Sequence, residues 1–140
     1  MTHEEIEELV RVGYARLNRG DRDASGAREL ASLDVWHPEA VYVNSADDPD
    51  PGVHDGIEAV RRQVGRWVEA YPDLQVEPLE ILSNDDVAFV WVRFSGHGAG
   101  SGVPMEMELA HVISYEDHRV RRLEEYPTRD GGLAAAGLAQ

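Results

Sequence analysis

The first long apolar pattern of the chain lies within residues 2–20 and repeats every three to four positions. This spacing places the apolar side chains on one face of an amphipathic helix. Thr2 and Glu5 have the spacing of a capping box at the start of this helix, and Gly20 is suited to its end. A second pattern of the same period, over residues 57–71, predicts another helix.

The segment between these two helices carries shorter patterns. Residues 21–33 predict one or two short helical turns, and residues 37–39, His-Pro-Glu, predict a turn. Residues 40–45 alternate between apolar and polar side chains, which indicates a short strand. Residues 46–55 are acidic and rich in proline, which is typical of a loop.

Beyond the second helix the pattern changes from the period of a helix to the alternation of strands. Four antiparallel strands are expected, over residues 74–82, 87–97, 103–115 and 119–126. Pro78 lies within the first of them and confines it to a sheet edge or splits it. The tail, residues 127–140, is rich in glycine and alanine and predicts a loosely packed terminal turn.

This order, with helices early and strands late, predicts an α+β fold in which helices pack on one face of a curved, mostly antiparallel sheet. A curved sheet wrapped around N-terminal helices forms a cone with an interior cavity, which suits a small ligand. The length of 140 residues suits one domain, over residues 1–140.

Charge and composition exclude several classes of function. The chain has 13 Lys+Arg against 27 Asp+Glu, a net charge of −14, which argues against nucleic acids and anionic membranes as partners. All basic residues are arginine and cysteine is absent, which excludes Schiff-base chemistry, thiolate nucleophiles and cysteine-bound metals. The sequence shows no signal peptide and no apolar run long enough to span a bilayer, so we expect a cytoplasmic protein. We also expect that it uses no cofactor.

Several short segments carry a family resemblance. They are Leu17-Asn18-Arg19-Gly20-Asp21, His37-Pro38-Glu39-Ala40-Val41, His54-Asp55-Gly56-Ile57-Glu58-Ala59-Val60, Tyr71-Pro72-Asp73-Leu74, Arg119-Val120 through Glu125-Tyr126, and Ala134-Ala135-Ala136-Gly137-Leu138. With the order of the elements, they resemble the SnoaL-like, polyketide cyclase-like branch of the nuclear-transport-factor-2-like superfamily. The resemblance implies a cystatin-like α+β barrel, a small apolar or aromatic ligand, and a homodimer formed through the sheet.

The first candidate pair is His111 with a glutamate of the last strand. Alternation places His111 on the apolar face of strand 103–115, where a histidine is either a core residue or part of a site. A two-residue turn would set Glu124 opposite His111, whereas a bulged or longer turn would set Glu125 there. The resemblance favours Glu125, because polyketide cyclases carry a catalytic aspartate that aligns with it and a histidine that aligns with His111.

Tyr42 and Asn44 form the second candidate pair, since they share one face of strand 40–45. In the limonene epoxide hydrolase branch a Tyr-x-Asn motif holds the attacking water, and Arg93 could stand in for that branch's arginine. No aspartate follows Arg93 on strand 87–97, so the epoxide hydrolase mechanism would lack one of its two carboxylates. The remaining residues that we expect to line the cavity are Tyr14, Trp36, Trp67, Trp91, Arg93 and Met105.

Two functions are consistent with these residues. The first is cofactor-free proton transfer of the isomerase or cyclase type on a small ketone or polyketide-like ligand. Glu125 would act as acid or base, His111 would orient the ligand, and Tyr42 and Asn44 would donate hydrogen bonds. The second is a non-catalytic ligand-binding or dimerisation module of the same fold. We expect no metal site, because His97 lies about 23 Å along the strand from the level of His111.

Overall fold

The computed structural model describes residues 1–19, 31–49 and 51–138. These residues form three helices and one six-stranded sheet, which confirms the predicted α+β class. The elements are α1 (His3–Arg19), β1 (Trp36–Val43), β2 (Val53–Asp55), α3 (Ile57–Ala70), β3 (Gln75–Asn84), β4 (Val87–His97), β5 (Pro104–Glu116), β6 (Arg119–Tyr126) and α4 (Arg129–Ala135). The helical turns predicted over residues 21–33 lie mostly outside the described residues.

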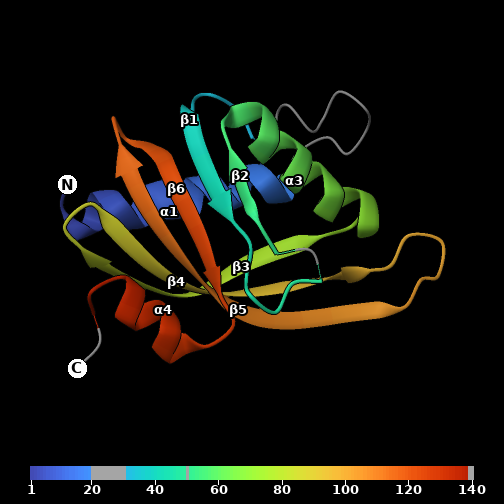
Figure 1. The fold of residues 1–140 in the computed structure, drawn as a ribbon. Helices are drawn as coiled ribbons and strands as arrows, with labels where there is room; N and C mark the ends of the chain where they lie inside the picture. The colour runs from blue at the N-terminus through green and yellow to red at the C-terminus, as the bar shows by residue number, and fades with distance from the viewer. Residues whose placement is uncertain (20–30, 50, 139–140) are drawn as a thin grey trace.

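The strands follow the order β2-β1-β6-β5-β4-β3 across the sheet, which is curved and not closed (Figure 1). β1 and β6 are parallel, and every other neighbouring pair is antiparallel. β3 is an edge strand whose pairing with β4 shifts between Pro78 and Glu80, as the proline predicted.

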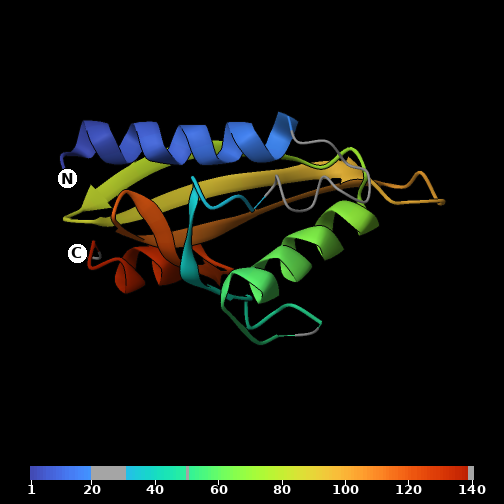
Figure 2. The same cartoon turned by 90° about the horizontal axis from the view of Figure 1, so that it is seen from above.

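The helices divide between the two faces of the sheet. α1 and α3 pack with the large core cluster on one face, here called the concave face. α4 packs with a smaller cluster on the opposite, convex face. Figure 2 shows α1 and α4 on opposite sides of the strands. The predicted capping box starts α1, since the amide of Glu5 donates to Thr2 Oγ1 at 3.1 Å and the amide of Thr2 donates to Glu5 Oε1 at 3.2 Å.

The segment around β1 differs from the prediction. The turn expected at residues 37–39 lies inside β1, whose pairing with β6 shifts between Trp36 and Val41. Proline has no N–H to donate to a sheet ladder, so Pro38 accounts for both the turn-like pattern and the irregular pairing. The loop expected at residues 46–55 ends in β2, which pairs antiparallel with β1.

The glycine- and alanine-rich end of the chain forms α4, where the pattern predicted a loose turn. Thr128 caps this helix, because its Oγ1 accepts a hydrogen bond from the amide of Gly131 at 3.1 Å. Gly132 lies directly on the sheet, where an added Cβ would come within 2.5 Å of the Ala110 Cβ and 2.9 Å of the Phe89 ring. The small residues therefore allow α4 to pack closely on β4 and β5.

Candidate functional site

Cross-strand rows on the concave face bring the candidate residues together. Tyr115 of β5 and Trp36 of β1 both pair with Val120 of β6, and these three residues form the distal row. The next row along the sheet is the middle row, in which Ile113 and Tyr42 both pair with Leu123. His111 pairs with Glu125 in the proximal row. On β5 these are alternating positions, and on β1 and β6 the register shifts bring the matching residues to the same face, which α1 and α3 cover.

The register that sets Glu125 opposite His111 depends on a bulge. Asp117 and His118 have positive φ values of 54° and 60°, as a two-residue hairpin turn requires. This turn alone would pair His111 with Glu124. The register shifts by one residue between Ser114 and Tyr115, however, and His111 therefore faces Glu125.

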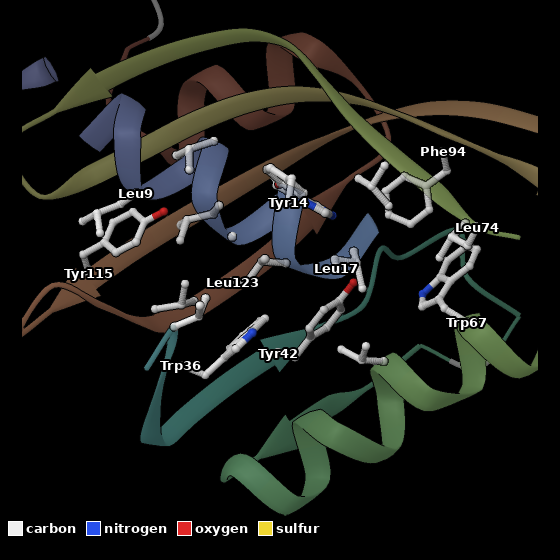
Figure 3. A pocket seen from close by; sticks show the side chains of 18 residues that line it. Leu9, Tyr14, Leu17, Trp36, Tyr42, Trp67, Leu74, Phe94, Tyr115 and Leu123 are labelled. Carbon is white, nitrogen blue, oxygen red and sulfur yellow. Dashed lines mark hydrogen bonds between the residues drawn. The ribbon is translucent and has the colours of Figure 1, made fainter. Parts of the chain in front are cut away.

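A cavity lies between this face of the sheet and the two helices α1 and α3 (Figure 3). It is lined mainly by apolar side chains. The volume that the centres of water-sized molecules can occupy inside it is about 70 Å³. Since one water needs roughly 10–15 Å³ by this measure, the cavity has room for several waters or for a compact ligand. Five of the predicted residues line it: Tyr14, Trp36, Tyr42, Trp67 and His111.

A buried chain of hydrogen bonds borders the cavity. The Tyr14 hydroxyl lies 2.5 Å from His111 Nδ1, and His111 Nε2 lies 3.3 Å from Glu125 Oε2. The Tyr42 hydroxyl donates to the same Oε2 at 2.6 Å, and the amide of Ser45 donates to Oε1 at 3.3 Å. His111 is 3% exposed and Glu125 is 4% exposed. Glu125 does not line the cavity but lies behind His111 and Tyr42.

The protons in this chain follow from the donors available. Burial raises the pKa of Tyr14 well above its usual range, and the charges of Tyr115 and Glu125 add to the effect. Burial also raises the pKa of Tyr42, and Glu125 adds to it. Both tyrosines therefore keep their protons. If His111 Nε2 carries the ring proton that faces Glu125, then Nδ1 accepts the hydrogen bond of Tyr14.

Asn44 does not line the cavity, in contrast to the prediction. Its Nδ2 donates to Asp48 Oδ2 at 3.2 Å, and its Oδ1 is hydrogen-bonded to His54 Nε2. β1 ends at Val43, so Asn44 lies just beyond the strand and joins the following loop to β2. The side chain is thereby held by the loop and by β2, outside the lining of the cavity.

Trp91 and Arg93 lie on the convex face, so the prediction that they line the cavity is wrong. Trp91 pairs with Ala110 and packs with the α4 cluster, and its indole donates to Glu108 at 3.0 Å. Arg93 lies 3.3 Å from Glu106 in an ion pair. Residues 87–92 are apolar on both faces, so alternation could not tell which face the helices α1 and α3 cover.

Met105 and His97 lie next to the loop that joins β4 to β5. Met105 packs at the margin of the core cluster but does not line the cavity. His97 Nδ1 lies 2.6 Å from Asp73 Oδ2, away from His111.

Among the described residues no three acidic or histidine side chains are arranged to hold a metal ion. In the same part of the chain, no helix has the length and hydropathy needed to cross a membrane.

Two features of the site escaped the sequence analysis. Tyr115 lines the cavity, and its position four residues after His111 on the same strand was a usable signal. The amide of Ser45 donates to Glu125, and a contact made by the backbone leaves no trace in the sequence pattern.

Comparisons with known proteins relate this geometry to one family. The family model for the SnoaL-like domain matches residues 10–123. The phenazine biosynthesis protein PhzA1 of Pseudomonas aeruginosa is 27% identical over 142 residues, covering 96% of this chain and 86% of that protein.

Two solved structures share the fold. One, from Jannaschia sp. CCS1, is assigned by name to the SnoaL-like polyketide cyclases; it is 17% identical with a TM-score of 0.72, over 98% of this chain and 94% of that one. The other is a hypothetical protein with a ketosteroid isomerase-like fold from Catenulispora acidiphila, in complex with trimethylamine. It is 16% identical with a TM-score of 0.70, over 94% of this chain and 93% of that one.

Proposed function

The chain belongs to the SnoaL-like domain family, and we propose that its cavity binds a small carbonyl compound and transfers a proton to or from it without a cofactor. The fold alone supports many functions, so the proposal rests on the site. The observation that carries it is the buried chain Tyr14–His111–Glu125–Tyr42 at the border of a mainly apolar cavity.

The proposed reaction begins when a ligand's carbonyl oxygen replaces His111 as the acceptor of the Tyr14 hydroxyl. His111 Nδ1 is then free to take a proton from the carbon next to the carbonyl, and the electron pair of that C–H bond moves onto the oxygen. The Tyr14 hydroxyl stabilises the resulting enolate, and the carboxylate of Glu125 stabilises the protonated ring. In a ligand with a C=C bond next to the enolate, return of the proton from His111 to the far carbon of the dienolate completes an isomerisation. In a ligand with a second carbonyl, attack of the enolate carbon on that carbonyl closes a ring, and His111 returns its proton to the resulting alkoxide.

The roles of the two central residues are thereby exchanged relative to the sequence analysis, which assigned the proton transfer to Glu125 and orientation to His111. The lining favours His111 as the base, because His111 borders the cavity and Glu125 lies behind it. Glu125 acts as a positioning residue that is held in place by Tyr42 and the amide of Ser45.

The size and lining of the cavity favour a compact and largely apolar ligand, as the sequence analysis expected. Two similar proteins are associated with small molecules: PhzA1 with phenazine biosynthesis and the Catenulispora protein with trimethylamine. A small ketone or polyketide-like ligand agrees with both the lining and the family. The homodimer through the sheet and the cytoplasmic location remain predictions from the sequence.

Deuterium exchange tests the proposal without knowledge of the natural substrate. Cyclic ketones in D₂O exchange the protons next to the carbonyl, and NMR follows both this exchange and the binding of the ketone. We expect the protein to accelerate exchange and His111→Gln to lower the acceleration by about 10²–10⁴-fold. His97→Gln, which changes an exposed histidine outside the cavity, serves as the matched control. Exchange that is unchanged in His111→Gln would disprove the assignment.

A second candidate function is a binding module without chemistry. It is favoured by one observation: Glu125 receives hydrogen bonds from Tyr42 and Ser45 and contacts His111, as a satisfied core carboxylate would. In the same experiment, ketone binding without accelerated exchange would select this alternative.

A further inference from the structure

Tyr115 and Trp36 lie at the end of the cavity that the proposed reaction does not use. They flank Val120 in the distal row, two strands apart, which corresponds to roughly 10 Å between their Cα atoms. Each is 8% exposed and each lines the cavity. Figure 3 shows Tyr115 well separated from Tyr42 and Trp67. We call Trp36 and Tyr115 the distal pair.

The polar atoms of the distal pair have no hydrogen-bond partner among the residues that the structure describes. The hydroxyls of Tyr14 and Tyr42 and the indole of Trp91 are hydrogen-bonded, whereas the indole of Trp67, which also lines the cavity, has no partner among the described residues. Neither polar atom of the distal pair is fully enclosed, because the buried side-chain nitrogen or oxygen that lacks a partner among the described residues is Arg93 Nε. The Tyr115 hydroxyl and the Trp36 indole N–H thus keep accessible surface on residues that line the cavity, where they are available to bond with what occupies it.

The Cα atom of Tyr115 is far from that of His111 in the proximal row, whereas the Trp36 ring stacks on the Tyr42 ring with 6.3 Å between the ring centroids. Tyr115 follows His111 by four positions on β5, which corresponds to about 13 Å between their Cα atoms. Between them lies the middle row of Ile113, Leu123 and Tyr42, and the Tyr42 hydroxyl is directed to Glu125. The cavity thus has hydrogen-bonding groups at both ends and an apolar middle.

We propose that the distal pair is a second polar subsite, which selects ligands that carry a hydrogen-bond acceptor at the end remote from the reacting carbonyl. This inference rests on the proposed function, in which Tyr14 and His111 hold the first carbonyl. An indole N–H only donates, and burial raises the pKa of Tyr115 so that its hydroxyl keeps its proton. Both groups therefore favour an acceptor, and the ligand class is a compact dicarbonyl, such as a cyclic diketone or a quinone.

Matched ketones test the distal pair by binding alone. The probes are cyclohexanone against cyclohexane-1,4-dione and, for a longer span, 1-decalone against decalin-1,5-dione, each titrated by NMR. In at least one series we expect the diketone to bind about tenfold more tightly than the monoketone, since one hydrogen bond to a buried donor is worth about that factor. Tyr115→Phe removes one of the two donors and should lower this preference severalfold, with the affinity for the monoketone changed by less than about twofold.

Tyr126→Phe is the control for the loss of a tyrosine hydroxyl. Tyr126 packs on the convex face and donates to Glu124 at 3.0 Å, so its variant should keep the preference for the diketone. Equal binding of monoketone and diketone by the unaltered protein would overturn the distal subsite and leave the proposed function standing. Equal weakening of both ligands in Tyr115→Phe would overturn it as well, since that result indicates a packing role. If none of the four probes binds, the proposed function fails and the subsite fails with it.

Discussion

The two faces of the curved sheet are packed in opposite ways, and two helical glycines show the difference. On the convex face, a Cβ added to Gly132 of α4 would lie 2.5 Å from the Ala110 Cβ, closer than two carbons can approach. On the concave face, a Cβ added to Gly13 of α1 would meet its nearest neighbour, Val35 Cγ1, at 3.7 Å, an ordinary contact. One glycine is needed for close packing, and the other borders open space.

This difference indicates that the cavity does not result from a shortage of large residues. Five aromatic side chains besides Phe94 border it: Tyr14, Trp36, Tyr42, Trp67 and Tyr115. The tightly packed convex face combines large residues, including Phe89 and Trp91, with the small residues Ala110, Gly132 and Ala136. Protein interiors are normally close-packed, and an open volume among large residues lowers stability. The concave face therefore carries the features expected of a binding site, and the convex face those of a structural support.

The largest expected effect is a difference in stability between variants of two neighbouring glutamates, which lie on opposite faces of the sheet. Glu125→Ala leaves the Tyr42 hydroxyl, the Ser45 amide and His111 Nε2 without their acceptor. We expect a loss of about 3–5 kcal/mol in the free energy of unfolding, measured by urea denaturation. Glu124→Ala is the control, because the Glu124 carboxylate contacts half-buried Tyr126 and exposed Arg122, and its loss should cost less than about 1 kcal/mol. Equal costs at the two positions would show that the buried chain adds nothing to stability.

The next largest effect is expected on the stability of the convex face, which is closely packed. Gly132→Ala gains helix propensity but forces the new methyl into Ala110 and the Phe89 ring. We expect the clash to prevail, with a net loss of about 1–3 kcal/mol in the free energy of unfolding, as is typical of overpacked interiors. Cyclohexanone affinity, measured by NMR titration, should stay unchanged because α4 lies on the convex face. A variant that is as stable as the unaltered protein would contradict close packing of α4.

The elements that could be predicted from the sequence are those with long, clear periodicity. The two long helices and the four late strands appear near their expected positions, and so do the capping box at Thr2 and the edge strand at Pro78. The terminal helix α4 was missed because the pair Gly131-Gly132 lowers helix propensity, whereas here Gly132 allows close packing against the sheet. Local composition does not reveal a contact with strands that lie far away in the sequence.

The site could be predicted only in part, for reasons of register and orientation. Alternation correctly placed His111 on the face with the core. The choice between Glu124 and Glu125 depended on a bulge of one residue, for which periodicity carries no signal. Trp91 was placed wrongly because β4 is apolar on both faces, so that only the position of the helices decides which side is the cavity.

The smallest expected effect is a gain in stability, opposite in sign to the effects above, and it completes the comparison of the two glycines. Gly13→Ala replaces a glycine within α1 at a position where the new methyl has room, so we expect a gain of about 0.5–1 kcal/mol in the free energy of unfolding. Because Gly13 lines the cavity, the same methyl should narrow it and weaken the binding of cyclohexanone. Urea denaturation and NMR titration measure the two quantities on one sample. A gain in stability with a loss of affinity means that the open volume serves the ligand at the expense of the fold. A loss of stability would mean that the concave face is packed as tightly as the convex one, and the contrast between the two faces would then be wrong.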